Sequence, residues 1–191
     1  MVPFRLILEV DHNLAMIGIS AARNRLIERA LQDPECKFVV NLSNDLFDFT
    51  PKWLLKMVLY LGDHEEVGCV NGINFANYSP SEWKTWTVSG REIHYGDTFE
   101  DEVSSSVAGQ ISMVRADVLR KIGLYDLNYG LGSYEGLDLG FRIQDAGYSI
   151  VLLSTVQAKH DIQDGNCKIL GAACQADLNS PYHRQKWGDR K

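Results

Sequence analysis

The sequence has few basic residues for its length, and none of them cluster before the last few positions. Its 19 Lys and Arg are outnumbered by 25 Asp and Glu, which gives a net charge of −6. A protein that binds nucleic acid needs a basic face to neutralise the phosphates. This charge balance therefore argues against a nucleic-acid partner.

Long apolar runs are also absent. No stretch approaches the roughly 20 apolar residues of a membrane-spanning helix. The apolar segment 1–10 lacks the basic residues that open a signal peptide, and it is better interpreted as a strand. We therefore expect no membrane span, with the cytoplasm as the default location.

Paired cysteines are missing as well. The four cysteines form no CxxC motif, so nothing indicates an oxidising compartment. Cys36 and Cys69 lie in or beside strand-like segments and are expected to be small core residues. A zinc site is conceivable, although the spacings fit no standard zinc pattern. Its ligands would be His160, Cys167, Cys174 and His183.

The chain does have the composition of a globular domain and a regular alternation of patterns. With 191 residues, 45% of them apolar, it can form one domain with a large core. A helix pattern covers 20–31, and Thr50-Pro51 has the N-cap and first-turn signals of a second helix. This alternation predicts an α/β fold in which helices flank a mostly parallel, Rossmann-like sheet. The expected strands are 4–10, 37–42, 66–75, 107–114 and 148–154.

Two segments depart from this alternation. Residues 77–103 are polar and contain Trp83, Trp86 and Tyr95, aromatic residues that could either stack on a ligand or simply pack. We expect an insertion or hairpin there, lying across the sheet edge. Residues 160–191 are polar and irregular in pattern, and we expect them to form a C-terminal tail of the same single domain, 1–191.

Polar side chains follow several of the expected strands. Ligands of open α/β sheets bind at the carboxyl ends of the strands. Asp45 follows 37–42, Glu135 and Asp138 follow a glycine-rich loop, and His160 follows 148–154 after a short connection. We expect these four residues to converge at one edge, where carboxylates and an imidazole could hold a divalent metal. The plainer interpretation of Glu135 and Asp138 is that they complement the positive end of a helix dipole.

Five stretches stand out in chain order. They are "IGISAARN" (17–24), "FVVNLSNDLFDFTPKWL" (38–54), "SSSVAGQISMVRADVLRKIGLYD" (104–126), "GLGSYEGLDLGFRIQDAGYSIVLL" (130–153), and "KH" (159–160) with the closing "YHRQKWG" (182–188). In residue pattern and in their order along the chain they resemble the motifs of the family 2 glycosyltransferases of the GT-A fold. Together they span nearly the whole chain.

The resemblance implies an inverting glycosyltransferase. Such an enzyme moves a sugar from a nucleoside-diphosphate sugar to a hydroxyl of a glycan or lipid-linked acceptor, with Mn²⁺ or Mg²⁺ on the diphosphate. Carried over by position, Asp45 and His160 are the metal ligands. Arg23 and Asn44, together with Asp45, lie where the family meets the diphosphate.

The sequence departs from the family's pattern at three places. The metal-binding DxD motif reads Ser43-Asn44-Asp45, so only its second aspartate is present. The usual catalytic base position holds Gly136, so we take Asp138 as the first candidate for the base and Glu135 as the second. That glycine could deepen an acceptor pocket or mark a decayed site.

The third departure concerns the start of the sequence. Family members begin with a βαβ segment that binds the nucleotide base. Here Met1 stands just before what corresponds to the third strand. We therefore expect the base pocket to be missing from this chain or replaced, and a partner segment could supply it.

Two other interpretations remain. One is a non-catalytic, truncated glycosyltransferase-like domain that binds a glycan or a partner chain. The other is a nucleotidyltransferase, which would need a glycine-rich phosphate loop with a lysine after the first strand. The sequence has no such loop.

Overall fold

The computed structural model describes residues 18–79, 82–83, 86–88, 91–130, 132–161 and 175–190. The strand expected at 4–10 lies outside these residues. Among the described helices, none has both the length and the apolar character that crossing a bilayer requires.

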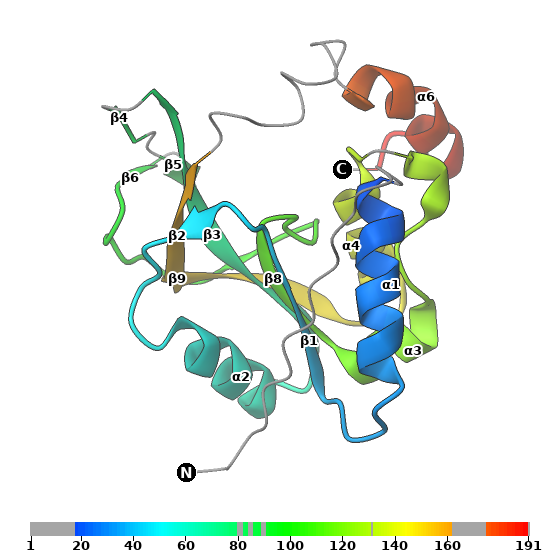
Figure 1. The fold of residues 1–191 in the computed structure, drawn as a ribbon, viewed down its shortest axis with the longest axis horizontal. Helices are drawn as coiled ribbons and strands as arrows, with labels where there is room; N and C mark the ends of the chain where they lie inside the picture. The colour runs from blue at the N-terminus through cyan, green and yellow to red at the C-terminus, as the bar shows by residue number, and fades with distance from the viewer. Residues whose placement is uncertain are drawn as a thin grey trace.

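A mixed seven-stranded sheet forms the centre of the molecule (Figure 1). Its main path runs in the order β1-β8-β3-β9-β2, while β4 pairs with β3 and β7 pairs with β9. Strands β1, β3 and β9 run in one direction, and β8 lies antiparallel between β1 and β3. The strands are β1 (Phe38–Leu42), β2 (Leu46–Phe47), β3 (Val67–Ser79), β4 (Glu82–Trp83), β7 (Glu102–Val103), β8 (Ile111–Arg115) and β9 (Ser149–Asp161).

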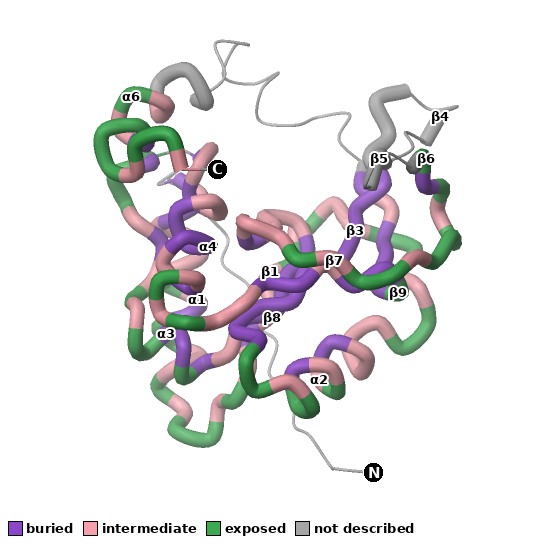
Figure 2. The backbone as a smooth tube through the Cα atoms, turned by 180° about the vertical axis from the view of Figure 1, so that it is seen from behind, coloured by how far each residue is buried: buried purple, intermediate pink, exposed green. Residues whose placement is uncertain are grey.

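Helices cover both faces of this sheet, as the α/β prediction requires (Figures 1 and 2). The helices are α1 (Ile19–Leu31), α2 (Trp53–Asp63), α3 (Ala116–Ile122), α4 (Glu135–Asp145), α6 (Gln175–Trp187) and the 3-10 turn η1 (Leu127–Tyr129). Helices α1, α3 and α4 lie on one face, and α2 lies on the other. The predicted α/β fold is confirmed. The sheet is mixed rather than mostly parallel, because among the described strand pairs only β3 and β9 pair in parallel.

Strand alternation divides the core between these two layers. Cys69 and Ile150 point into the cluster under α1, α3 and α4. Their neighbours Val70 and Val151 point into the cluster under α2, with Met57 and Leu61 of that helix. The central strands β3, β8 and β9 are apolar on both faces, because successive residues point to opposite sides of a sheet that helices cover on each side.

Strand β9 is longer than the sequence predicts, and His160 lies inside it. Residues 149–152 pair with the start of β3, and residues 157–161 pair with its later part. Between them the register shifts opposite Gly72, where an added Cβ would lie 2.7 Å from Val156 Cγ1. This bulge lets β9 continue along β3 and then pair with β2. The expected connection before His160 is therefore wrong.

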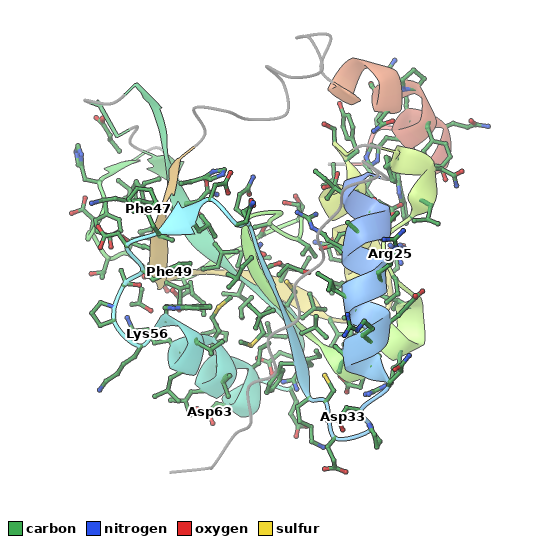
Figure 3. All side chains as sticks on the ribbon, viewed as in Figure 1. Arg25, Asp33, Phe47, Phe49, Lys56 and Asp63 are labelled. Atoms are coloured by element: carbon green, nitrogen blue, oxygen red, sulfur yellow. The ribbon has the colours of Figure 1, made fainter. Side chains whose placement is uncertain are left out.

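The start of α2 also differs from the expectation. The helix begins at Trp53, after Lys52 adopts a left-handed conformation. The Thr50 hydroxyl does not cap the helix; it donates to Thr155 O at 3.0 Å and accepts from Gln157 N at 3.0 Å. Thr50 thus ties the loop to the bulge of β9. It directly follows Phe49 (Figure 3), and the Phe49 ring stacks on that of Trp53.

Both segments that depart from the alternation, the expected insertion or hairpin at 77–103 and the expected irregular tail at 160–191, contain regular structure. Within 77–103, β3 continues to Ser79, and β5 (Trp86–Val88) and β6 (Arg91–Ile93) form a separate two-stranded ribbon. Residues 175–187 form α6, so the expectation of an irregular tail is wrong there. That helix has almost no amphipathic periodicity, because it docks mainly through polar and aromatic contacts, and periodicity analysis therefore misses it.

Helix α4 packs at backbone contact distance against residues 105–107. A Cβ at Gly136 would lie 2.3 Å from Val107 O, and one at Gly140 would lie 2.3 Å from Ser105 O. The two glycines are four residues apart and share one helix face. Only glycine lets the segment approach this closely.

Replacing Gly140 by Ala should destabilise the domain. The new Cβ would meet backbone rather than a flexible side chain, and overpacking of this kind costs about 1–3 kcal/mol. Gly62→Ala in α2 is the matched control, because no described atom lies within 4 Å of its Cβ position. It should gain up to about 1 kcal/mol from helix propensity. Urea unfolding measures both, and equal effects would contradict the packing explanation.

Candidate functional site

The candidate site lies at the edge of the sheet where β1 ends and β8 begins. The turn Ser43-Asn44-Asp45 connects β1 to β2 at this edge. Ser43 N–H donates to Gln110 O at 2.9 Å, which fixes the turn against the segment that leads into β8. Asn44 is exposed at the tip of the turn.

Asp45 and His160 lie together at this edge. His160 is buried in β9 between Ala76 of β3 and Leu46 of β2, and the pairing with Leu46 places Asp45 beside its ring. Asp45 Oδ1 lies 3.0 Å from His160 Nε2. The two atoms are not aligned for a hydrogen bond, and no donor among the described residues bonds this buried oxygen.

This arrangement fits two ligands of one divalent metal. Adjacent ligands of an octahedral ion bound at about 2.1 Å lie about 3 Å apart, and both point at the ion rather than at each other. A carboxylate oxygen and an imidazole nitrogen suit Mn²⁺. The described residues contain no group of three or more metal-ligating side chains, so this part of the chain would supply two ligands, Asp45 and His160.

Arg23 and Glu135 form the second pair at the site. Arg23 Nη1 donates to Glu135 Oε1 at 3.1 Å, and its Nη2 donates to Gly109 O at 2.6 Å. Because Gly109 precedes the Gln110 that holds Ser43, one short segment joins this pair to the Asp45 turn. The Glu135 side chain is only 10% exposed.

Two residues that the sequence analysis did not single out support this pair. Asn24 holds the backbone of Tyr125 through both its amide nitrogen (2.8 Å) and its amide oxygen (3.0 Å). The Tyr125 ring lies 5.3 Å from the Arg23 guanidinium carbon, and burial raises the pKa of its hydroxyl to about 12. Asn24 directly follows Arg23 in the "SAARN" motif, which was the available signal.

A buried amide holds the connecting segment in place. Asn71 Nδ2 donates to Ser106 O at 2.8 Å, and Asn71 Oδ1 accepts from Ala108 N at 2.9 Å. A polar residue in an apolar strand, "VGCVNGINF", was the available signal for it. These bonds place residues 106–108 between β3 and α4.

Asp138 lies apart from both pairs, at the contact between α4 and α6. It is fully buried, and both of its oxygens are engaged. Oδ1 accepts from Trp187 Nε1 at 2.8 Å and pairs with Lys186 Nζ at 2.7 Å, while Oδ2 pairs with Arg142 Nη2 at 2.9 Å. Both oxygens of this carboxylate are thus bound by side chains of α4 and α6.

The titratable groups around α6 are shifted by burial and by this network. Burial favours the neutral form of Asp126, yet the Lys186 and Tyr182 hydrogen bonds outweigh it and lower the carboxyl pKa. Burial also favours neutral Lys186, but its bonds to Asp126 and Asp138 raise the ammonium pKa. Burial lowers the pKa of His183, with Asp138 partly opposing, so this ring is neutral near pH 7.

Gly136 leaves no space for a deeper acceptor pocket. The Val107 carbonyl occupies the position that a side chain at 136 would take, and Val107 N–H donates to Gly136 O at 2.9 Å. The glycine is thus explained by packing, and the expectation that it deepens a pocket is wrong.

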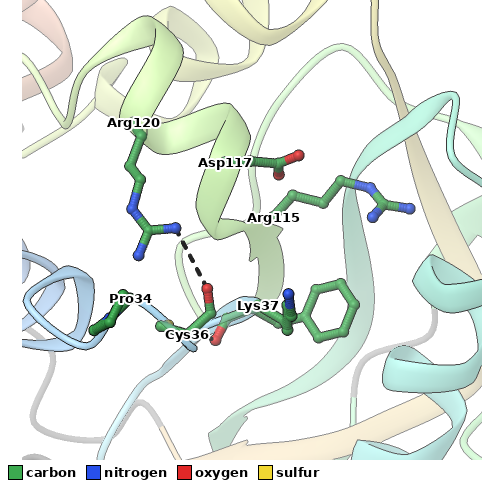
Figure 4. Close-up of a pocket in the computed structure, with 7 residues that line it drawn as sticks. Pro34, Cys36, Lys37, Arg115, Asp117 and Arg120 are labelled. Atoms are coloured by element: carbon green, nitrogen blue, oxygen red, sulfur yellow. Dashed lines mark hydrogen bonds between the residues drawn. The ribbon is translucent and has the colours of Figure 1, made fainter.

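A basic pocket lies near the opposite end of β1, away from these residues (Figure 4). Its two arginines are occupied by backbone carbonyls. Arg120 Nη2 donates to Asp33 O at 3.0 Å beyond the end of α1, and Arg115 Nη2 donates to His64 O at 2.8 Å at the end of α2. These side chains neutralise helix C-termini, so we assign the pocket a structural role.

The conceivable zinc site receives no support from the described residues. His160 faces Asp45, whereas His183 contacts the Tyr129 hydroxyl. Cys167 and Cys174 lie outside the described residues. Cys69 is buried and Cys36 is half-buried, and both thiols are free.

Comparisons with known proteins identify the fold. No protein-family model matches the chain, and no curated protein matches it in sequence. A crystal structure of GalNAc-T7 with UDP, GalNAc and Mn²⁺ is similar over 75% of this chain and 30% of that one, with a TM-score of 0.54 and 14% identity. The crystal structure of A197 from STIV is similar over 74% of this chain and 66% of that one, with a TM-score of 0.50 and 14% identity.

These similarities show that the chain has a GT-A-like α/β fold, which it shares with the GalNAc-T7 structure. The chain spans less than a third of the length of GalNAc-T7. At 14% identity the likeness extends to the fold alone.

Asp138→Asn should cost about 3 kcal/mol of stability. This is the lower end for breaking a buried ion pair, because Lys186 and Arg142 keep some contact with solvent. An acid that only complemented the helix dipole would cost under about 1 kcal/mol. Asp145→Asn is the matched control on the same helix: it pairs with Arg190 at the surface, and its loss should cost under about 1 kcal/mol. Thermal and urea unfolding compare them, and similar losses would refute the anchoring role of Asp138.

Proposed function

We propose that the chain acts as a metal-assisted glycosyltransferase of the family 2 type. It would transfer a sugar from a nucleoside-diphosphate sugar to a hydroxyl of a glycan or lipid-linked acceptor, with inversion. The observation that supports this most is the pair Asp45 and His160, which leaves a buried carboxylate oxygen without a hydrogen bond at the strand-end edge of a GT-A-like sheet. The order of the five sequence motifs supports the same assignment.

Asp45 and His160 would hold the Mn²⁺ or Mg²⁺. When bound, such an ion offsets the charge that builds up on a leaving diphosphate. With two protein ligands, the remaining positions would be filled by phosphate oxygens and water. Asn44 is exposed beside Asp45, where its amide can donate to the same diphosphate.

Arg23 would connect donor binding to the catalytic base. Its guanidinium is paired with Glu135 in the free protein, and a diphosphate would compete for the same N–H groups. A bound nucleoside-diphosphate sugar would therefore loosen the Arg23–Glu135 pair. The released carboxylate could then accept the proton of the acceptor hydroxyl.

We assign the base to Glu135 rather than Asp138, the first candidate from the sequence. Geometric reach comes before a tuned pKa in choosing a base. Asp138 is fully buried and bonded by Lys186, Arg142 and Trp187, whereas Glu135 begins α4 beside the site.

A non-catalytic domain that binds a glycan or a partner chain is the second candidate. It is favoured by Gly136, which leaves the usual base position without an acid, and by the engagement of Asp138 in packing. It differs from the first proposal in predicting ligand binding without transfer or donor hydrolysis.

Metal uptake should depend on the diphosphate. We expect little Mn²⁺ to bind alone and measurable Mn²⁺ to bind with UDP, because the described residues offer only the two ligands Asp45 and His160. Asp45→Asn should weaken Mn²⁺-dependent UDP binding by about tenfold or more, since loss of even an outer-shell partner of a metal ligand typically costs that much. Asp48→Asn is the matched control, because Asp48 pairs with Lys159 at 2.6 Å outside the metal pair. If calorimetry shows that neither EDTA nor Asp45→Asn changes the affinity for UDP, the metal assignment is wrong.

Glu135→Gln should fold and bind UDP with Mn²⁺ normally, yet lose transfer or donor hydrolysis by about 10²–10⁴-fold, the usual contribution of general base catalysis. Gly136→Asp should not raise activity, because its Cβ would collide with the Val107 carbonyl. Rates for both variants are compared with wild type. An unchanged rate for Glu135→Gln would exclude it as the base, and a wild type that binds UDP without turnover would favour the non-catalytic domain.

A further inference from the structure

The loop that leads into Glu135 has an unusual backbone conformation. Ser133 and Tyr134 both have positive φ angles, 72° and 69°, and Gly132 before them has a φ of 138°. Residues with a side chain rarely adopt this region, and two in succession persist only where surrounding contacts hold them. The position of Glu135 depends on this loop because the helix starts directly after it.

Helix α6 supplies those contacts. Asn179 Nδ2 donates to Tyr129 O at 2.7 Å and to Ser133 O at 3.2 Å, and it also bonds Gly132 O. One amide thus bonds carbonyls at both ends of the loop. One turn further along α6, the His183 ring stacks on the Tyr134 ring with centroids 4.7 Å apart.

The remainder of α6 is fixed to the domain by charged contacts. Lys186 pairs with Asp126 at 2.6 Å and with Asp138 at 2.7 Å, and the Trp187 indole donates to Asp138. Beyond the helix, Arg190 pairs with Asp145 at 2.7 Å, at the far end of α4. The helix is therefore held at one end by α4 and holds the loop with its other end.

We propose that α6 is a latch that positions Glu135, and that Asn179 is the positioning residue. The positioning role rests on the proposed function, because Glu135 is taken as the base. The contacts by which α6 holds the loop do not depend on that function. Removing the Asn179 amide would leave the left-handed loop without its central contact and let the start of α4 move.

Two backbone amides report on the start of α4 without any ligand. Asp138 N–H donates to Tyr134 O at 2.9 Å, and Val107 N–H donates to Gly136 O at 2.9 Å. Asn179→Ala should raise hydrogen exchange at both amides by about tenfold or more. Arg190→Gln is the matched control. It removes the ion pair with Asp145 just beyond the C-terminal end of α6, away from the loop, and should leave both amides protected.

A second variant separates loop holding from general destabilisation. Glycine adopts positive φ freely, so Ser133→Gly lowers the conformational cost that the Asn179 hydrogen bonds must offset at residue 133. The double variant Ser133→Gly with Asn179→Ala should recover part of the lost protection. The proposed role of α6 is wrong if the double variant recovers no protection. It is also wrong if Asn179→Ala and Arg190→Gln raise hydrogen exchange at the two amides equally.

Kinetics test the positioning of Glu135. Asn179→Ala should lower kcat for transfer or donor hydrolysis by about tenfold while UDP affinity with Mn²⁺ stays unchanged. A parallel loss of kcat and UDP affinity would mean that α6 only stabilises the fold, and would refute the positioning role. A wild type without turnover would refute the proposed function instead, and the exchange results would then decide the latch alone.

Discussion

Residues 104–110 run along helix α4 so closely that backbone carbonyls occupy the places where side chains at 136 and 140 would begin. This contact has consequences at both ends of the segment. At one end Asn71 clamps Ser106 and Ala108, and at the other the carbonyls of Gly109 and Gln110 receive Arg23 and Ser43. The two halves of the site therefore share one connecting segment. Its position depends on the absence of side chains on one face of α4.

Three acids near this connector differ in role because their surroundings differ. Asp138 is fully buried among Lys186, Arg142 and Trp187, and its charge joins two helices. Glu135 is held by a single guanidinium that a diphosphate could also engage. Asp45 has a side chain that is 38% exposed, yet its Oδ1 atom is buried without a hydrogen bond, which is costly unless something else binds that atom. The same chemical group thus serves as anchor, base candidate and ligand candidate, and burial with its partners decides which.

Much of the fold could be predicted from the sequence because it depends on local patterns. The strands at 37–42 and 66–75 and the helix at 20–31 follow from apolar periodicity, and the structure places them within a few residues. The continuation of β9 to Asp161 could not be predicted, since it depends on a bulge opposite Gly72 in another strand. Thr50 was misread for a similar reason, because its hydroxyl bonds β9 instead of its own helix. Helix α6 lacks the periodicity that sequence analysis detects, since it docks through Asn179, Lys186 and Trp187.

The pairing of Asp45 with His160 was expected from their places at strand ends, whereas the burial of Asp138 was not visible in its spacing. Spacing shows which side chains share a helix face, and it is silent on what a distant segment places against that face. Asp138 and Glu135 are three residues apart on α4, yet α6 covers one of them and α1 meets the other. The covering helix comes some forty residues later in the chain, so no local pattern around Glu135 could reveal it. The role of each acid in α4 is therefore set by long-range packing, and the short motif that contains them specifies only that both lie at the start of one helix.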